Sequence, residues 1–304
     1  MSSSAQKDPT NSTNQRLKGV LLVLLSSITM STKAIVAKLT YLEGIDALTT
    51  LSMRMFFAVP LLVLSAYFAE KKADRRLNRR EIVWIVLLGI TGYYFSTLGD
   101  FYGLAYISAS LERLVLFLYP TFVVLLSAVL FRKRLTRWQG LALLVTYVGM
   151  GIVFHNERNL SGPFVVKGSL FVLGCSIGYA IYLVGAGRLI PHVGASRFNA
   201  YSLLSGTVFL FIHWFIFGRS LFGLPWIVYV YGVLLATIGT VIPTVLLSKG
   251  IALTGAGPAA ILTTVGPIST IVLAHVLLGE PITLGQTLGS LLVLLGVTLV
   301  SLRK

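Results

Sequence analysis

Long apolar segments alternate with short polar segments from residue 17 to the end of the sequence. Each apolar segment runs for roughly 20 residues, the length that a helix needs to cross the hydrocarbon core of a bilayer. Barrel strands would be shorter and would alternate apolar with polar side chains. Helices also satisfy their backbone hydrogen bonds within one segment. The pattern therefore predicts an all-α integral membrane protein with ten transmembrane helices, at 17–39, 46–68, 81–101, 105–131, 138–155, 164–186, 198–217, 226–247, 256–278 and 283–302.

The composition agrees with a membrane protein, because 56% of the residues are hydrophobic and only 12% are charged. A soluble domain carries about 25% charged residues. The net charge of +15 would also suit a nucleic-acid-binding protein. Membrane proteins, however, concentrate Lys and Arg in the loops that stay in the cytoplasm, and the ten apolar segments favour that interpretation. The polar segment 1–16 is rich in Ser, Asn, Thr and Gln, and we expect a disordered cytoplasmic tail there.

The positions of Lys and Arg predict the orientation in the membrane. With a cytoplasmic N-terminus, eighteen Lys and Arg residues fall in segments on the cytoplasmic side and four on the outer side. This imbalance predicts that both termini are cytoplasmic. The remaining three basic residues, Lys33, Arg54 and Arg113, lie within predicted helices.

An internal repeat relates the two halves of the chain. The stretch ISASLERLVLFLYPTFVVLLSAVLFRKRLT, residues 107–136, aligns without gaps with TGAGPAAILTTVGPISTIVLAHVLLGEPIT, residues 254–283. The same offset brings Pro120 to Pro267 and Gly149 to Gly296. A shared proline, turn threonine and glycine in one register indicate a duplication. We expect two five-helix repeats, at 17–155 and 164–304.

An odd number of helices in each repeat makes the second repeat enter the membrane in the opposite direction. The basic turn 132–137 has as its counterpart the turn 279–284, which contains Glu280 and neither Lys nor Arg. Inverted repeats are typical of secondary transporters, in which two halves rock about a site near the middle of the membrane. A duplicated bundle that serves as a scaffold without transport is the less favoured alternative.

Motifs in both halves resemble the EamA family of the drug/metabolite transporter superfamily. The segment GPAAILTTVGPISTIVLAHVLLGEPIT resembles the fourth helix of that family's repeat and its Gly-Glu-x-x-Thr turn, here Gly279, Glu280 and Thr283. The segment MSTKAIVAKL resembles the family's first helix and keeps its lysine as Lys38, although Met30-Ser31 stands where the family has Trp-Gly. Arg54 in SMRMFF matches an arginine common in the family's second helix.

This resemblance implies a ten-helix carrier, usually in a bacterial inner membrane, that often exports metabolites such as amino acids. It also implies alternating access around a central cavity between the two halves. Lys33, Glu112 and Arg113 stand where small or neutral residues would be expected, and they suggest a subfamily with its own substrate.

Five ionisable residues lie within predicted helices at a similar depth, in the outer half of the first repeat: Lys33, Arg54, Asp100, Glu112 and Arg113. A buried charge is costly in a membrane unless it faces a cavity or another charge. We therefore name these five as candidate substrate-binding or coupling residues. Successive helical residues differ by about 100° in direction, so Glu112 and Arg113 cannot both point into one cavity.

Two interpretations of the five residues stay open. In one, they form a salt-bridge network, for instance Lys33 or Arg54 with Asp100 or Glu112. In the other, they form the polar wall of a cavity whose surplus positive charge favours an anionic or zwitterionic solute. Asp100 or Glu112 is also a candidate proton carrier, although nearby cations favour the charged form of a carboxyl group.

The sequence thus predicts a secondary transporter, and an exporter in particular, of small polar metabolites such as amino acids or organic anions. A lipid- or sugar-phosphate translocase of similar architecture is the alternative. Pro120 and Pro267 are candidate hinges, because proline bends or breaks a helix. The sequence contains no nucleophile–base pair, phosphate loop or HExxH motif, so we expect no enzymatic activity, cofactor or metal. We also expect the transporter to be a monomer.

Overall fold

We describe the protein from a computed structural model that places residues 9–71, 73, 75–130, 132, 136–161, 163–254, 259 and 262–302. Every long element in this part of the chain is a helix. The helices of the first half are α1 (Pro9–Leu42), α2 (Ala47–Lys71), α3 (Arg79–Gly89), η1 (Ile90–Phe95), α4 (Ser96–Leu104), α5 (Ala109–Leu116), α6 (Tyr119–Leu130) and α7 (Arg137–Ser161). Those of the second half are α8 (Val165–Val193), α9 (Ala195–Phe217), α10 (Trp226–Ala236), η2 (Thr237–Val241), α11 (Ile242–Thr254), α13 (Val265–Leu278) and α14 (Leu284–Leu302).

The predicted membrane-spanning pattern is present in the structure. Eight helices are long and apolar enough to cross a bilayer, and two shorter apolar helices, Val265–Leu278 and Leu284–Leu299, follow them. The ninth predicted span, 256–278, begins in a stretch that lies largely outside the described residues. Helix α1 starts at Pro9, inside the segment 1–16 that we expected to be disordered, and residues 1–8 lie outside the described part of the chain.

Two spans contain a π-helical segment at the same position of the repeat. The segment η1 joins α3 to α4, and η2 joins α10 to α11. Their first residues, Ile90 and Thr237, are separated by the same offset that relates Pro120 to Pro267. A π-helical turn inserts one extra residue and leaves a local widening of the helix, frequently at a functional site.

The helices that contain the candidate hinge prolines are broken ahead of each proline. A turn at residues 117–118 separates α5 from α6, and a turn at residues 263–264 precedes α13. Pro120 and Pro267 then lie in the first turn of the following helix, where the missing N–H costs little. At both positions the proline therefore follows a helix break and does not bend a continuous helix, and its role as a hinge stays a prediction.

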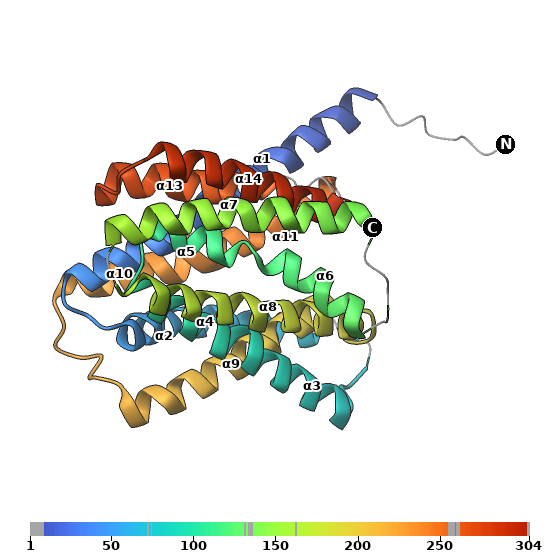
Figure 1. Ribbon diagram of the computed structural model, residues 1–304. Helices are drawn as coiled ribbons and strands as arrows, with labels where there is room; N and C mark the ends of the chain where they lie inside the picture. The colour runs from blue at the N-terminus through green and yellow to red at the C-terminus, as the bar shows by residue number, and fades with distance from the viewer. Residues whose placement is uncertain are drawn as a thin grey trace.

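Helices from the two halves of the sequence are exchanged between two bundles. Helix α1 packs against α10, α11 and α13 of the second half, and we call this group the first bundle. Helix α8 packs against α3, α4, α5 and α6 of the first half, and we call this group the second bundle. Helices α2 and α9 pair with each other, as do α7 and α14, so each contact has a counterpart in the other half (Figure 1).

Glycines allow close contacts between these exchanged helices. A Cβ on Gly103 would lie 2.4 Å from a methyl carbon of Val172, and a Cβ on Gly250 would lie 2.5 Å from one of Val23. Gly103 and Gly250 are equivalent in the repeat. Small residues of this kind let helix backbones approach each other in membranes. The two repeats therefore make the same close helix contact, once in each bundle.

The helices end at two faces of the molecule. Lys71, Arg79, Arg137 and Arg197 lie at one face, which we call the basic end. The C-terminal ends of α1 and α13 and the N-terminal end of α5 lie at the other, which we call the Glu280 end. In Figure 1 the basic end is on the right, where α1 begins and α14 ends.

Candidate functional site

Lys33 of the first bundle lies between two carboxyl groups of the second bundle. Its Nζ atom forms an ion pair with Oδ2 of Asp100 on α4 and lies 3.9 Å from Oε1 of Glu112 on α5. The relative exposures of the three residues are 7%, 3% and 0%. A buried charge in a membrane protein is expected to have such a partner. The contact also joins the two bundles, because α1 belongs to one and α4 and α5 to the other.

The carboxyl groups of Asp100 and Glu112 both face the ammonium group of Lys33, and each acid lies within electrostatic range of the other. Both Glu112 oxygens and Oδ1 of Asp100 are buried and accept no hydrogen bond from any donor in the described part of the protein. A buried polar atom without a partner is rare in proteins and requires an explanation. Lys33 and Arg113 together balance the charges of the two carboxylates, and Arg54 beside them adds one positive charge.

Arg113 faces the interior and also joins the bundles. Its Nε donates a 3.2 Å hydrogen bond to Oγ1 of Thr270 on α13, and its Nη2 donates a 2.8 Å bond to the carbonyl oxygen of Met30 on α1. Only 6% of the residue is exposed. Glu112 and Arg113 therefore point to different neighbours, as the helical geometry predicted. We call Lys33, Asp100, Glu112 and Arg113 the charge network.

Arg54 lies beside the charge network but is not paired with an acid by any described ion pair. Its Nε donates a 2.9 Å hydrogen bond to Oγ1 of Thr240 in η2, and its guanidinium group lies 5.6 Å from the ring centre of Phe101. The Nη1 atom is buried and makes no hydrogen bond within the described residues.

The two π-helical segments hold different chemistry in the two repeats. Gly239 of η2 packs against Lys33, and Gly92 of η1 packs against Tyr182. Because Gly92 and Gly239 are equivalent in the repeat, Lys33 and Tyr182 occupy corresponding places. The charged residues around Lys33 therefore have as their counterpart an aromatic group around Tyr182.

Four tyrosines and an asparagine form this aromatic group. The hydroxyl groups of Tyr93 and Tyr182 are 3.3 Å apart, and Tyr182 donates a 3.1 Å hydrogen bond to Oδ1 of Asn199. Tyr179 stacks on Tyr182 and meets Tyr119 edge-on, with ring centres 5.1 Å apart. Tyr119 was not among the residues predicted from the sequence, although it directly precedes the repeated Pro120.

Glu280 closes one end of the contact between the bundles. Its carboxylate accepts hydrogen bonds of 2.7 and 3.2 Å from the backbone N–H groups of Ala109 and Ser110, and one of 2.7 Å from the Ser110 hydroxyl. A carboxylate at a helix N-terminus is stabilised by the unpaired N–H groups and by the helix dipole. The sequence identified Glu280 as part of a turn motif and gave no sign of its partner on α5.

A second contact between the halves lies at the basic end. Arg197 of α9 forms two 3.0 Å hydrogen bonds to the carboxylate of Glu70 on α2, and it donates a 2.9 Å bond to the carbonyl oxygen of Arg75. Tyr201 also donates to Glu70, at 3.0 Å. Bidentate arginine–carboxylate contacts of this kind are among the stronger hydrogen bonds in proteins.

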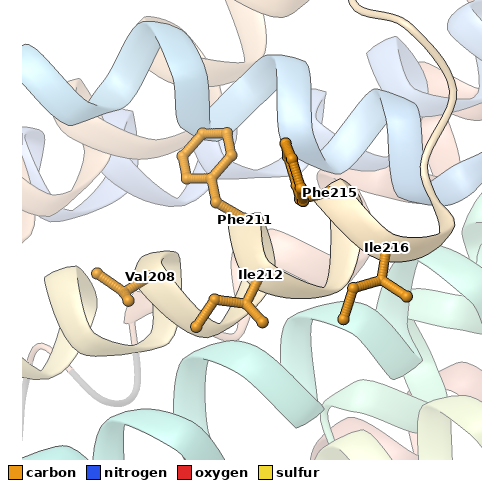
Figure 2. A pocket seen from close by; sticks show the side chains of 5 residues that line it. All are labelled: Val208, Phe211, Ile212, Phe215 and Ile216. Carbon is orange, nitrogen blue, oxygen red and sulfur yellow. The ribbon is translucent and has the colours of Figure 1, made fainter.

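Two surface grooves lie along α9, away from the charge network. The more apolar groove, of about 550 Å³, is lined by five side chains that follow the helix at intervals of three or four residues, Val208, Phe211, Ile212, Phe215 and Ile216 (Figure 2). An apolar stripe on a membrane helix is the surface expected to face lipid. The described residues contain no group of three or more His, Cys, Asp or Glu side chains that could hold a metal ion.

Comparison with known proteins identifies the family. The sequence matches the EamA-like transporter family over residues 17–155 and again over residues 166–302. The chain belongs to the EamA-like transporter family. Its two matched regions correspond to the two five-helix repeats, and the protein is a multi-pass membrane transporter with a small-molecule substrate.

Relatives of this EamA-like transporter are named as transporters. It is 29% identical to the uncharacterized transporter YcbK of Bacillus subtilis over 276 residues, covering 89% of this chain and 88% of that protein. It is 25% identical to the uncharacterized inner membrane transporter YicL of Salmonella typhimurium, covering 94% and 95% of the two chains. A crystal structure that is 19% identical in sequence superposes with a TM-score of 0.62 over 92% of this chain and 95% of the other, which shows a shared fold.

Proposed function

We propose that this EamA-like transporter exports a small anionic or zwitterionic metabolite, such as an amino acid or an organic anion, by alternating access. The observation that carries the proposal is the charge network, which is buried, belongs to one repeat only and joins the two bundles. In the second repeat the positions equivalent to Glu112 and Arg113 are Ala259 and Ala260. A duplicated scaffold would not require charges in one copy alone.

Alternating access would break the contacts of the charge network. If the bundles separate, Lys33 loses Asp100 and Arg113 loses Thr270 and Met30, and each cation is left without a partner. Removing one partner of a buried ion pair costs roughly 3–5 kcal/mol. A substrate carboxylate that binds Lys33, Arg54 or Arg113 would offset this cost. Opening would then be favourable mainly when substrate is bound.

The facing carboxyl groups of Asp100 and Glu112 support proton coupling within the same proposal. The charged and titratable groups around Glu112 are Lys33, Lys38 and Tyr41 of α1, Asp100 of α4, Cys175 of α8 and Arg113 of its own helix, with Arg54 of α2 beyond Asp100. A proton on Glu112 allows it to donate a hydrogen bond to Asp100 while Lys33 stays paired. Release of this proton on one side of the membrane would favour rearrangement of the network.

The proposed setting is the cytoplasmic membrane, with both termini in the cytoplasm. The excess of Lys and Arg on one side of the ten-helix pattern supports this orientation. The basic end would then face the cytoplasm, and the Glu280 end would face outward. The transport unit in this proposal is a monomer.

Solute counterflow in reconstituted vesicles tests the proposal. Vesicles that contain the full-length protein would each be loaded with one member of a panel of amino acids, organic anions and sugar phosphates. Uptake of the labelled solute would then be measured with and without a pH gradient. We expect exchange of an amino acid or an organic anion, accelerated by the gradient in the wild type and not in Glu112→Gln. Exchange of sugar phosphates alone would support the translocase alternative, and no exchange of any member would contradict a carrier of this class.

A further inference from the structure

A groove at the basic end differs from the apolar groove of Figure 2 in having a charged mouth. It has a volume of about 470 Å³ and lies between α3 and α9, with the end of α2 beside it. Its floor includes the buried Ile85, while Ile82 and Val208 on its walls are 47% and 55% exposed. The charged and polar side chains that line it are Glu70, Arg76, Arg197 and Tyr201, and we call the part of the groove that they line its mouth. Ligand sites in proteins commonly have volumes of this size.

The charges around the mouth do not balance. Arg197 is paired with Glu70, and Arg75 is paired with Glu81 at 2.6 Å. Arg76, Arg79 and Arg80 are exposed at the same end, and no described hydrogen bond or ion pair engages their side chains. Five arginines and two glutamates give this region a surplus of three positive charges. Such a surplus is complementary to an anionic group at the membrane surface.

The depth of the groove matches a lipid. From Arg79 to Val86 the helix α3 advances seven residues, or about 10 Å at 1.5 Å per residue. The charged mouth would therefore lie at the level of the headgroups, and the apolar walls would extend into the acyl-chain region. Exposed apolar side chains on both walls leave the groove open to the bilayer.

We propose that this groove binds one anionic glycerophospholipid. Its phosphate is held by Arg76, Arg79 and Arg80, and an acyl chain lies between Ile82 of α3 and Val208 of α9. Basic pockets between transmembrane helices are known to accept anionic headgroups. The bound lipid covers the Glu70–Arg197 contact and thereby stabilises the pairing of α2 with α9 at this end.

This lipid site is separate from the charge network. Ile82 and Asp100 lie on the same span, eighteen residues apart, which corresponds to about 27 Å along the helix. A substitution at the groove therefore changes lipid binding without touching the substrate site proposed above. Failure of either proposal leaves the other intact.

Native mass spectrometry of the purified full-length protein tests the lipid site. The protein would be equilibrated with equal amounts of phosphatidylglycerol and phosphatidylcholine of identical chains. We expect one phosphatidylglycerol to be retained in preference to phosphatidylcholine. Each arginine near the membrane surface contributes about a fivefold change in affinity. The triple variant Arg76→Gln, Arg79→Gln, Arg80→Gln is therefore expected to reduce retention of phosphatidylglycerol more than tenfold.

Matched variants separate charge, shape and folding. The triple change to lysine keeps the charge and is expected to keep most of the retention. Val208→Trp fills the groove and is expected to reduce the retention of phosphatidylglycerol. Val233→Trp on α10 and Arg137→Gln on α7 lie outside the groove and are expected to leave this retention unchanged. Each protein would be checked for a single peak in gel filtration. Equal retention of both lipids, or full retention of phosphatidylglycerol by the triple glutamine variant, would overturn the proposal.

Discussion

Among single residues, the ion pair of Lys33 with Asp100 is expected to contribute most directly to the stability of the buried charges. Lys33→Met removes the ammonium group that lies between Asp100 and Glu112. We expect a loss of roughly 3 kcal/mol in the free energy of unfolding, because one partner of a buried pair is removed. The double variant Lys33→Met, Asp100→Asn should lose less than the sum of the two single variants.

Unfolding by titration with sodium dodecyl sulfate would measure these free energies. Lys167→Met is the matched control, because Lys167 is exposed and, among the described residues, its side chain bonds to the hydroxyl of Tyr106 and lies over the ring of the same residue. Strictly additive losses for the two single variants would show that the ion pair contributes nothing.

The five buried charges could be found from the sequence, but their partners could not. Counting residues from the ends of the apolar segments places Lys33, Arg54 and Glu112 at one depth, because a helix has a fixed rise. The direction in which each side chain points depends on how the helices rotate against one another, and the sequence does not specify this. The bond from Arg54 to Thr240 also depends on a π-helical segment that has no recognisable pattern of apolar residues.

Among the helical elements, the same change from glycine to alanine is expected to affect stability differently in the two π-helical segments. In Gly92→Ala the added Cβ would lie 2.4 Å from Cγ of Tyr182, so the aromatic group must shift. In Gly239→Ala the added Cβ would lie 3.6 Å from Cβ of Lys33, an ordinary contact. Overpacking of this kind costs roughly 1–3 kcal/mol. We expect a lower midpoint of thermal unfolding for Gly92→Ala than for Gly239→Ala, and equal midpoints would contradict the described packing.

The contact between Glu280 and α5 gives a second prediction for an element. Glu280→Ala leaves two N–H groups of α5 without an acceptor, and the loss of such a cap costs about 1–2 kcal/mol. Unfolding in detergent should show this loss. Glu43→Ala, a change at an exposed acid at the same end, should leave stability unchanged. A wild-type free energy of unfolding for Glu280→Ala would mean that the cap is not formed in the membrane protein.

Helix positions followed from the apolar pattern, whereas helix breaks did not. The turn between α5 and α6 falls at residues 117–118, within an uninterrupted apolar run. Proline indicates that a helix changes there and does not indicate whether it bends or stops, because a proline is also tolerated in the first turn of a new helix.

At the scale of the whole molecule, the repeat could be predicted and the exchange of helices could not. Pro120 and Pro267 revealed the duplication because they share a register. The packing of α1 against α11 and α13, and of α8 against α4 and α6, joins residues that lie far apart in the sequence. Contacts of this kind depend on the match between helix surfaces, and a single sequence does not display that match.

The exchanged helices predict how fragments behave. A fragment of residues 1–161 contains α1 without α11 and α13, so the apolar and polar surfaces that they cover stay without a partner. We expect fragments 1–161 and 163–304 to aggregate when each is produced alone and to assemble when they are produced together. Gel filtration in detergent would show this difference. A single well-defined peak for either fragment alone would contradict the exchanged packing.

In the proposed function, the buried cations of the first repeat hold the substrate. Arg54→Ala and Arg113→Ala, made separately, would be compared by counterflow with whichever solute the wild type exchanges. Arg219→Ala is the control, because Arg219 is largely exposed and its ion pair with Asp46, at 3.8 Å, is of the surface kind that contributes little. We predict that Arg54→Ala and Arg113→Ala stay folded and lose transport at least tenfold, while the control keeps it. Normal folding together with normal transport in both variants would contradict the claim.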